Sequence, residues 1–152
     1  MRPVLIVAGL LLALGGHGPC GQVAPVPGGD IVRSYAPLGR YAGHWGVDLA
    51  ATTGTPVRAV LGGTVTFSGT VAGVMSVTVG HGGDLRTSYS YLASRAVGVG
   101  EQVEAGTILG ESGSDRDVGA LHLSLRVGEQ YRDPMRVLLC GSGTVVRPYL
   151  AP

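Results

Sequence analysis

The sequence predicts an all-β fold, an antiparallel sandwich built from short strands and hairpins. Glycine supplies 27 of the 152 residues, about 18% where about 7% is usual, and glycine is unfavourable inside helices but common in turns. Short runs rich in Val, Thr, Tyr and Leu also recur about every ten residues, with turn residues between them, which is typical of antiparallel sheets. Because 45% of the residues are hydrophobic, the chain can build one core, and its length suits a single domain.

Turn signals separate the candidate strands along the whole predicted domain. The residues His81–Asp84 include two adjacent glycines between two apolar runs, so they predict the tip of a β-hairpin. No stretch shows sustained helical periodicity. In chain order, the predicted strands are Ile31–Tyr35, Val47–Ala50, Pro56–Ala59, Gly63–Gly69, Met75–Gly80, Arg86–Leu92, Thr107–Glu111 and Leu121–Val127.

The segment Val97–Gly110 repeats valine and glycine at short intervals (VGVGEQVEAGTILG). Runs of this kind are typical of barrel-sandwich hybrid folds, in which glycines turn tight corners between short strands. Lipoyl and biotinyl carriers share the pattern, but they need a lysine, and all 11 basic residues of this chain are arginine. The segment therefore predicts the architecture without the carrier function, and the missing lysine also excludes Schiff-base chemistry.

The N-terminal segment predicts export. Arg2 is followed by twelve almost wholly apolar residues, Pro3–Leu14, and then by small residues. A membrane-spanning helix needs about 20 apolar residues, so this segment predicts a secretory signal, with no transmembrane span in the mature chain. A buried core helix is the alternative, and the cleavage point stays open. We expect a secreted, extracytoplasmic protein with a signal over residues 1–20, an extended lead-in over 21–30, a β domain over 31–138, and a C-terminal tail or last strand over 139–152.

The two cysteines, Cys20 and Cys140, lie near the two ends of the predicted domain. If Cys20 remains after processing, an exported chain allows a Cys20–Cys140 disulfide, and if Cys20 is removed, Cys140 is a lone thiol. Lipidation of Cys20 is a further alternative, although His17 stands three residues before it, where a lipobox has an apolar side chain. Neither cysteine has the spacing of a metal-binding pair.

The charge balance argues against a nucleic-acid partner. Eleven basic and ten acidic residues give a formal net charge of +1. Affinity for a phosphate backbone needs clustered positive charge, which this nearly neutral chain does not suggest.

His44 and Asp48 lie in the run HWGVDLAA, in which His44, Gly46 and Asp48 alternate along an extended chain. Four residues of straight strand span about 13 Å, whereas two ligands of one metal ion lie within about 4 Å of each other, because each bond is about 2 Å long. A shared metal therefore requires the chain to bend, and Gly46 is the residue that tolerates a bend. The alternative is a surface histidine beside a turn or helix-capping aspartate.

The other histidines of the predicted domain are His122 and His81. Within the run ALHLSLRV, leucines alternate with Ala120, His122, Ser124 and Arg126, so His122 is expected on the polar face of a half-buried strand. It is presented there to a groove or simply to solvent. His81 lies at the predicted hairpin tip and is interpreted as a turn residue.

Together, His44, Asp48 and His122 offer two neutral imidazoles and one carboxylate. Three such ligands leave the fourth position of a tetrahedral ion open for water, which is the composition of a catalytic rather than a structural zinc site. We therefore expect one zinc ion.

Several motifs, in this order, resemble the lysostaphin-like, LytM-type zinc metallopeptidase family, whose members are peptidoglycan endopeptidases. They are HWGVDLAA, GTPVRAVLGGTVTFSG, VTVGHGGDLRTSYSYL, VGEQVEAGTILG and ALHLSLRVG. The similarity covers roughly residues 31 to 138, and its most specific part is HxGxD followed by the LH strand. It implies a duplicated hybrid motif fold and a zinc site made by His44, Asp48 and His122. The chain also resembles a short, secreted, arginine-rich actinobacterial branch of the family.

The chain departs from the family pattern at both helper histidines. The first histidine of the family's HxH strand corresponds to Ala120, and the histidine of its YxHL strand corresponds to Tyr91. Amide hydrolysis needs a proton carrier and a group that stabilises the oxyanion, and one such group contributes a factor of roughly 10² to 10⁴. Tyr91 is a candidate oxyanion donor, whereas alanine can replace neither role.

Two functions follow from this incomplete set, beside a third hypothesis of a purely structural sandwich in which the cluster of His44, Asp48 and His122 is incidental. The first is a binding or regulatory relative of the peptidases at the cell wall, with peptidoglycan stem peptides or a cell-wall hydrolase as its partner. The alternative is an active zinc endopeptidase that cuts peptidoglycan cross-links, with Tyr91 and an acid such as Asp115 or Asp117 supplying the missing help.

Overall fold

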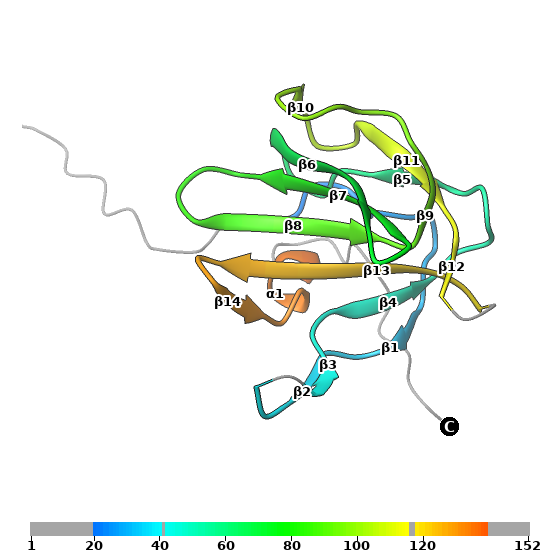
Figure 1. Cartoon of the computed structure of the whole chain (residues 1–152), viewed down its shortest axis with the longest axis vertical. Helices are drawn as coiled ribbons and strands as arrows, with labels where there is room; N and C mark the ends of the chain where they lie inside the picture. The colour runs from blue at the N-terminus through cyan, green and yellow to red at the C-terminus, as the bar shows by residue number, and fades with distance from the viewer. Residues whose placement is uncertain (1–19, 41, 116–117, 140–152) are drawn as a thin grey trace, which may run out of the picture.

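Antiparallel β-strands form nearly all of the regular secondary structure in the computed structural model, which describes residues 20–40, 42–115 and 118–139 (Figure 1). One large sheet dominates. Its strands, in spatial order, are β1 (Ile31–Arg33), β4 (Val47–Ala50), β13 (Val118–Val127), β8 (Leu85–Ser90), β7 (Val74–Gly80), β6 (Gly63–Val71) and β10 (Gln102–Val103). The predicted all-β, antiparallel fold is confirmed.

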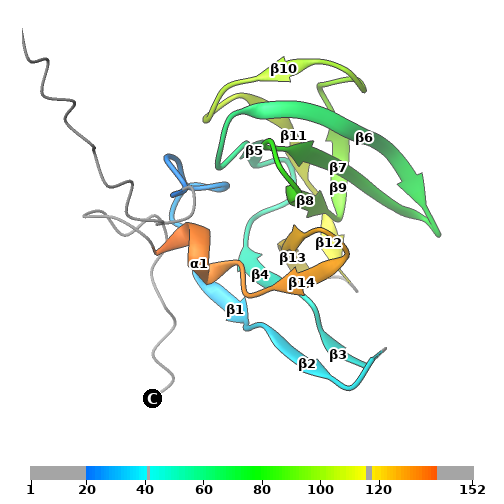
Figure 2. The same ribbon diagram turned by 90° about the vertical axis from the view of Figure 1, so that its left-hand side faces the viewer.

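Smaller units complete the fold. The short strands β12 (Ser114–Asp115) and β14 (Gln130–Arg132) pair with the two ends of β13. The hairpin of β2 (Ala36–Leu38) and β3 (Ala42–His44) extends beyond β1 at one edge of the large sheet, and β10 lies at the other (Figure 2). The remaining elements are a sheet of β5 (Pro56–Arg58), β11 (Ile108–Ser112) and β9 (Leu92–Arg95), and the helix α1 (Met135–Leu138).

The two faces of β13 separate the core from the functional surface. Leu121, Leu123 and Leu125 point into the core and are 0–3% exposed. They pack in one hydrophobic cluster with inward residues of β4, β6, β7 and β8, among them Leu49 and Val77. Burying a leucine contributes roughly 1.5–3 kcal/mol. The alternation expected for this strand is therefore observed, and its polar residues lie on the opposite face.

The predicted strand Arg86–Leu92 is wrong as a single element. The strand β8 ends at Ser90, Tyr91 takes a left-handed conformation with φ 63°, and β9 begins at Leu92. The Tyr91 carbonyl accepts the backbone N–H of Gly113 at 2.7 Å, which fixes this turn. The chain thereby passes from the large sheet into the three-stranded sheet, a change of direction that alternation of side chains could not indicate.

Other boundaries also differ from the sequence prediction. The first predicted strand ends at Arg33 rather than Tyr35, because the chain then enters the β2–β3 hairpin, which was not predicted. The helix α1 was not predicted either, since its four residues are too short for a periodic signal. Within the described residues, no helix is long and apolar enough to span a membrane. The predicted signal and the C-terminal segment lie almost wholly outside those residues, as does Cys140, so the disulfide stays a prediction.

His81 has a structural role at the tip of the β7–β8 hairpin, as interpreted from the sequence. Its Nδ1 donates to the Gly62 carbonyl at 2.8 Å, so in the neutral ring Nε2 accepts the Thr87 hydroxyl at 2.7 Å. The Thr87 hydroxyl also contacts the fully buried Tyr89 hydroxyl at 3.2 Å. The Tyr89 hydroxyl in turn accepts a hydrogen bond from the Val60 N–H at 2.8 Å. Burial lowers the pKa of His81 below 6.5, although the Gly62 hydrogen bond acts in the opposite direction.

We expect His81 to make the domain less stable in acid. The unfolded chain takes up a proton at this ring near pH 6.5, whereas the folded chain resists it, so the contribution is complete above that pH and is lost as pH falls below it. Between about pH 7 and about pH 5, the metal-free protein should therefore lose more free energy of unfolding than its His81→Gln variant. Urea denaturation of both proteins at both pH values measures this, and an equal loss in the two would contradict it.

Candidate metal centre

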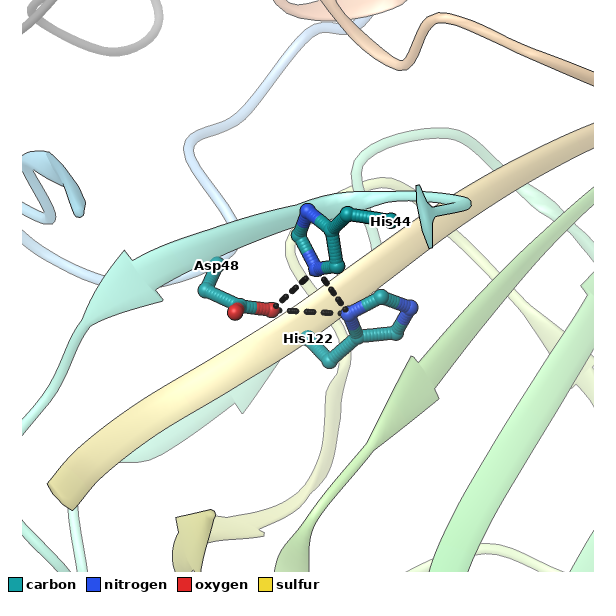
Figure 3. A group of neighbouring side chains, drawn as sticks. All are labelled: His44, Asp48 and His122. Carbon is teal, nitrogen blue, oxygen red and sulfur yellow. Dashed lines mark hydrogen bonds and ion pairs between the residues drawn. The ribbon is translucent and has the colours of Figure 1, made fainter. Parts of the chain in front are cut away.

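His44, Asp48 and His122 point toward one another on the outer face of the large sheet (Figure 3). His44 Nε2 lies 3.0 Å from Asp48 Oδ1, and His122 Nδ1 lies 2.7 Å from the same oxygen. The two ring nitrogens are 3.2 Å apart. The structure thus brings together the three side chains that the sequence predicted as a cluster.

Three different strands supply these residues. His44 ends β3, Asp48 is the second residue of β4, and His122 lies in β13 directly opposite Asp48. The chain turns at Trp45 and Gly46 between β3 and β4, so the bend that a shared metal requires is present. The Ser34 carbonyl accepts a hydrogen bond from His44 Nδ1 at 2.7 Å, which orients the ring and leaves the lone pair of Nε2 facing the cluster.

Gly46 is needed for close packing rather than for an unusual backbone angle, because its φ is not positive. A Cβ at this position would lie 2.6 Å from the His122 ring and 2.4 Å from the Leu123 carbonyl oxygen. The sequence singled out Gly46 because glycine tolerates a bend, whereas the structure shows that a side chain at this position would collide with β13. Gly46 lets the β3–β4 connection lie directly against β13.

The donor set fits a small divalent cation. The proton on His44 Nδ1 is donated to Ser34, so the neutral ring and the Asp48 carboxylate present two lone pairs to each other at 3.0 Å. Such a pair repels unless a proton or a metal ion lies between the atoms. A tetrahedral ion with bonds of about 2.0–2.2 Å holds its ligand atoms about 3.3–3.6 Å apart, so the three atoms, now 2.7–3.2 Å apart, need to separate only slightly to share one ion.

The electrostatics of the cluster keep the carboxylate ionised. Burial by itself would raise the pKa of Asp48, but its hydrogen bond to His122 and the attraction that each imidazole exerts when it carries a proton outweigh burial and lower the pKa below 3.8. Asp48 therefore offers a charged oxygen ligand at neutral pH.

The two helper positions hold no imidazole. Ala120 lies two residues before His122 on the same strand and is 3% exposed. Tyr91 lies beside the cluster, with its ring in a T-shaped contact with the His122 ring at a centroid distance of 6.2 Å. Asp115 lies in β12, and Asp117 lies outside the described residues.

A groove of about 650 Å³ runs from His122 across the outer face of β13, β8, β7 and β6. Its floor consists of rows of side chains in register: His122 with Ser90 and Ser76, then Ser124 with Ser88 and Thr78, and then Arg126 with Arg86. Trp45 and Tyr131 line the groove too, with ring centroids 5.6 Å apart. This surface was not predicted from the sequence, although the alternation of Arg86, Ser88 and Ser90 was a visible signal.

Residues 42–134 match the model of Peptidase family M23. The chain belongs to this family. The match includes the three clustered side chains and both helper positions, so the resemblance to lysostaphin-like peptidases is confirmed.

Individual relatives agree with this assignment. An uncharacterised protein of Mycobacterium tuberculosis is 47% identical over 68 residues, which cover 45% of this chain and 27% of that protein. The DD-carboxypeptidase/endopeptidase Mpg of Neisseria meningitidis is 36% identical over 99 residues, covering 63% of this chain and 23% of Mpg. The crystallised catalytic domain of lysostaphin from Staphylococcus simulans is 32% identical with a TM-score of 0.61, covering 67% of this chain and 86% of that domain.

The chain thus spans only about a quarter of the length of the curated relatives it matches. What is shared with them is the M23 domain, a peptidase-like domain related to peptidoglycan hydrolases. The matched regions leave about three quarters of the length of these two relatives uncovered.

We expect Gly46→Ala to disrupt the cluster. The added methyl group overlaps the His122 ring and the Leu123 carbonyl oxygen, so the backbone must move, at a cost of about 1–3 kcal/mol in the free energy of unfolding. Thermal denaturation and zinc titration of the purified protein measure the two consequences. Gly98→Ala is the matched control, because its Cβ meets only a flexible Glu101 oxygen, at 3.2 Å. Equal stability of the two variants would contradict the packing role of Gly46.

Proposed function

We propose that this M23 domain holds one zinc ion on His44, Asp48 and His122 and acts at peptidoglycan as a binding or regulatory module that does not hydrolyse it. A bound zinc ion would supply Lewis-acid activation in the family's chemistry. The observation that carries the proposal is the absence of any imidazole at positions 91 and 120, beside an intact ligand set. In the described residues the remaining histidine, His81, bonds to Thr87, which faces the core rather than the groove.

The arrangement of the chain's own residues supports binding without turnover. His44 and Asp48 are fixed by the Ser34 carbonyl and by the β4–β13 register, so the ligand set is preorganised. No comparable group is available for proton transfer at position 120, because the side chain of Ala120 cannot bind or release a proton. Losing two groups that each contribute roughly 10² to 10⁴ leaves little rate. Peptidoglycan stem peptides or a cell-wall hydrolase are the partners we propose, in an extracytoplasmic setting.

One observation favours the alternative, an active zinc endopeptidase that cuts peptidoglycan cross-links. The ring of Tyr91 packs edge-on against the ring of His122, so its side chain lies beside the ligand set. A phenolic hydroxyl can donate a hydrogen bond to an oxyanion. Tyr91 would then partly replace one helper histidine, with Asp115 as the candidate acid.

We expect the purified protein to bind about one zinc ion per chain after dialysis against zinc. His122→Ala removes one of three ligands and should reduce the bound zinc at least tenfold. Metal analysis measures both, and His81→Gln, which alters a histidine outside the cluster, should retain the ion. Equal zinc in the wild type and His122→Ala would exclude this site.

We also expect the zinc-loaded wild type to leave a peptidoglycan suspension unchanged, and Tyr91→His combined with Ala120→His to clear it. Histidine tolerates the left-handed backbone of residue 91 better than most side chains do. Ala120 is buried, so an imidazole there must displace its neighbours, and zinc content and thermal denaturation will establish that the double variant is folded. Clearing by the wild type that is lost in His122→Ala would establish the alternative, whereas a folded, zinc-bound but inert double variant would contradict the assignment of these positions.

A further inference from the structure

Two arginines face each other at the end of the groove away from the metal cluster. Arg86 of β8 and Arg126 of β13 are direct partners in the antiparallel register, and both side chains line the groove. Like charges directly opposite each other destabilise a sheet pair. The arrangement therefore costs stability in the free protein, and an anion between the two guanidinium groups would relieve that cost.

The chain only partly neutralises this arginine pair. Arg86 donates to the Gly128 carbonyl at 2.6 Å and to the Glu129 carboxylate at 2.9 Å, but the Glu129 side chain is 87% exposed. The Nε of Arg86 is buried without a hydrogen-bond partner. Arg126 contacts the Tyr131 ring, with its guanidinium carbon 5.4 Å from the ring centroid, and within the described chain it has no carboxylate partner.

The rest of the groove offers no competing charge. No aspartate or glutamate is among the described residues that line it. The hydroxyls of the floor pair with one another, Ser76 with Ser90 at 2.9 Å and Thr78 with Ser88 at 2.8 Å. The groove is therefore a neutral, hydroxyl-lined channel with a metal cluster at one end and two cations at the other.

The spacing between the two ends indicates what fits. Arg126 is four residues from His122 on the same strand, which corresponds to about 13 Å at about 3.3 Å per residue. An extended peptide of about four residues has this length. A carboxylate matches guanidinium groups in charge and geometry better than any neutral group does.

We propose that the groove binds an extended peptide whose free carboxylate lies on Arg86 and Arg126 while its other end reaches the metal cluster. This inference rests on the proposed peptidoglycan-binding function and names the ligand class, a stem peptide with a free carboxylate about four residues from the metal cluster. The carboxylate accepts hydrogen bonds from the guanidinium groups of Arg86 and Arg126, the two residues that line this end of the groove.

The test compares two ligands that differ only in charge. A synthetic tetrapeptide of stem-peptide sequence, whose only carboxylate is C-terminal, is titrated calorimetrically into the zinc-loaded protein beside the same peptide with a C-terminal amide. We expect the acid to bind the wild type about tenfold more tightly than the amide, because hydrogen bonds to charged groups are lost on amidation. In Arg126→Gln, this preference should fall below about twofold.

Two further variants separate a specific site from general attraction. Arg136→Gln removes the same charge from an exposed position on α1, outside the groove, and should keep the tenfold preference. Glu129→Gln removes the carboxylate that competes for Arg86 and should strengthen binding of the acid by about twofold to fivefold.

Each outcome has a distinct meaning. Equal binding of acid and amide by the wild type would overturn the arginine subsite and leave the proposed peptide binding intact. The same loss of preference in Arg136→Gln as in Arg126→Gln would also overturn it, because the effect would then be general electrostatics. Failure of the wild type to bind either peptide would instead contradict the proposed binding of peptidoglycan stem peptides itself.

Discussion

The register between β4 and β13 is the constraint on which the rest of the site depends. It places Asp48 opposite His122, and the same pairing places Leu49 opposite Leu121 on the core side. Because side chains alternate along a strand, a slip of one residue would turn His122 into the core and the leucines into the groove. The buried leucines of β13 therefore stabilise the geometry of the His44, Asp48 and His122 cluster as well as the fold. Truncating one such leucine costs about 2–5 kcal/mol, so the core opposes any alternative pairing.

Two backbone features complete that geometry. At Gly46 the absence of a side chain lets the β3–β4 connection approach β13 closely enough for His44 to reach Asp48 and His122. At Tyr91 a left-handed conformation, which costs of the order of 1–3 kcal/mol for a residue with a side chain, turns the chain out of the large sheet. That strained turn places the Tyr91 ring against His122, where the family pattern has an imidazole.

The site separates the two requirements that a peptidase combines. Holding a peptide requires a groove with complementary chemistry, and the groove that we propose for this role has a hydroxyl floor and a cationic end. Accelerating hydrolysis requires groups that act more strongly in the transition state than in the ground state. The positions that would carry those groups hold an alanine and a tyrosine, while the groups that would hold a metal and a ligand are retained. The proposed function is therefore binding without turnover.

The sequence by itself determined the antiparallel β class, the polar and apolar faces of the last long strand, and the family, because glycine content, alternation and the HxGxD motif are local signals. It also indicated that the chain bends between His44 and Asp48, but it did not indicate that Gly46 is needed for close packing against β13. The break at Tyr91, the pairing of Arg86 with Arg126 and the rows of hydroxyls were decided only by the tertiary structure. Each depends on which strand lies beside which and in what register, and those are set by packing of the whole core rather than by any local run of residues.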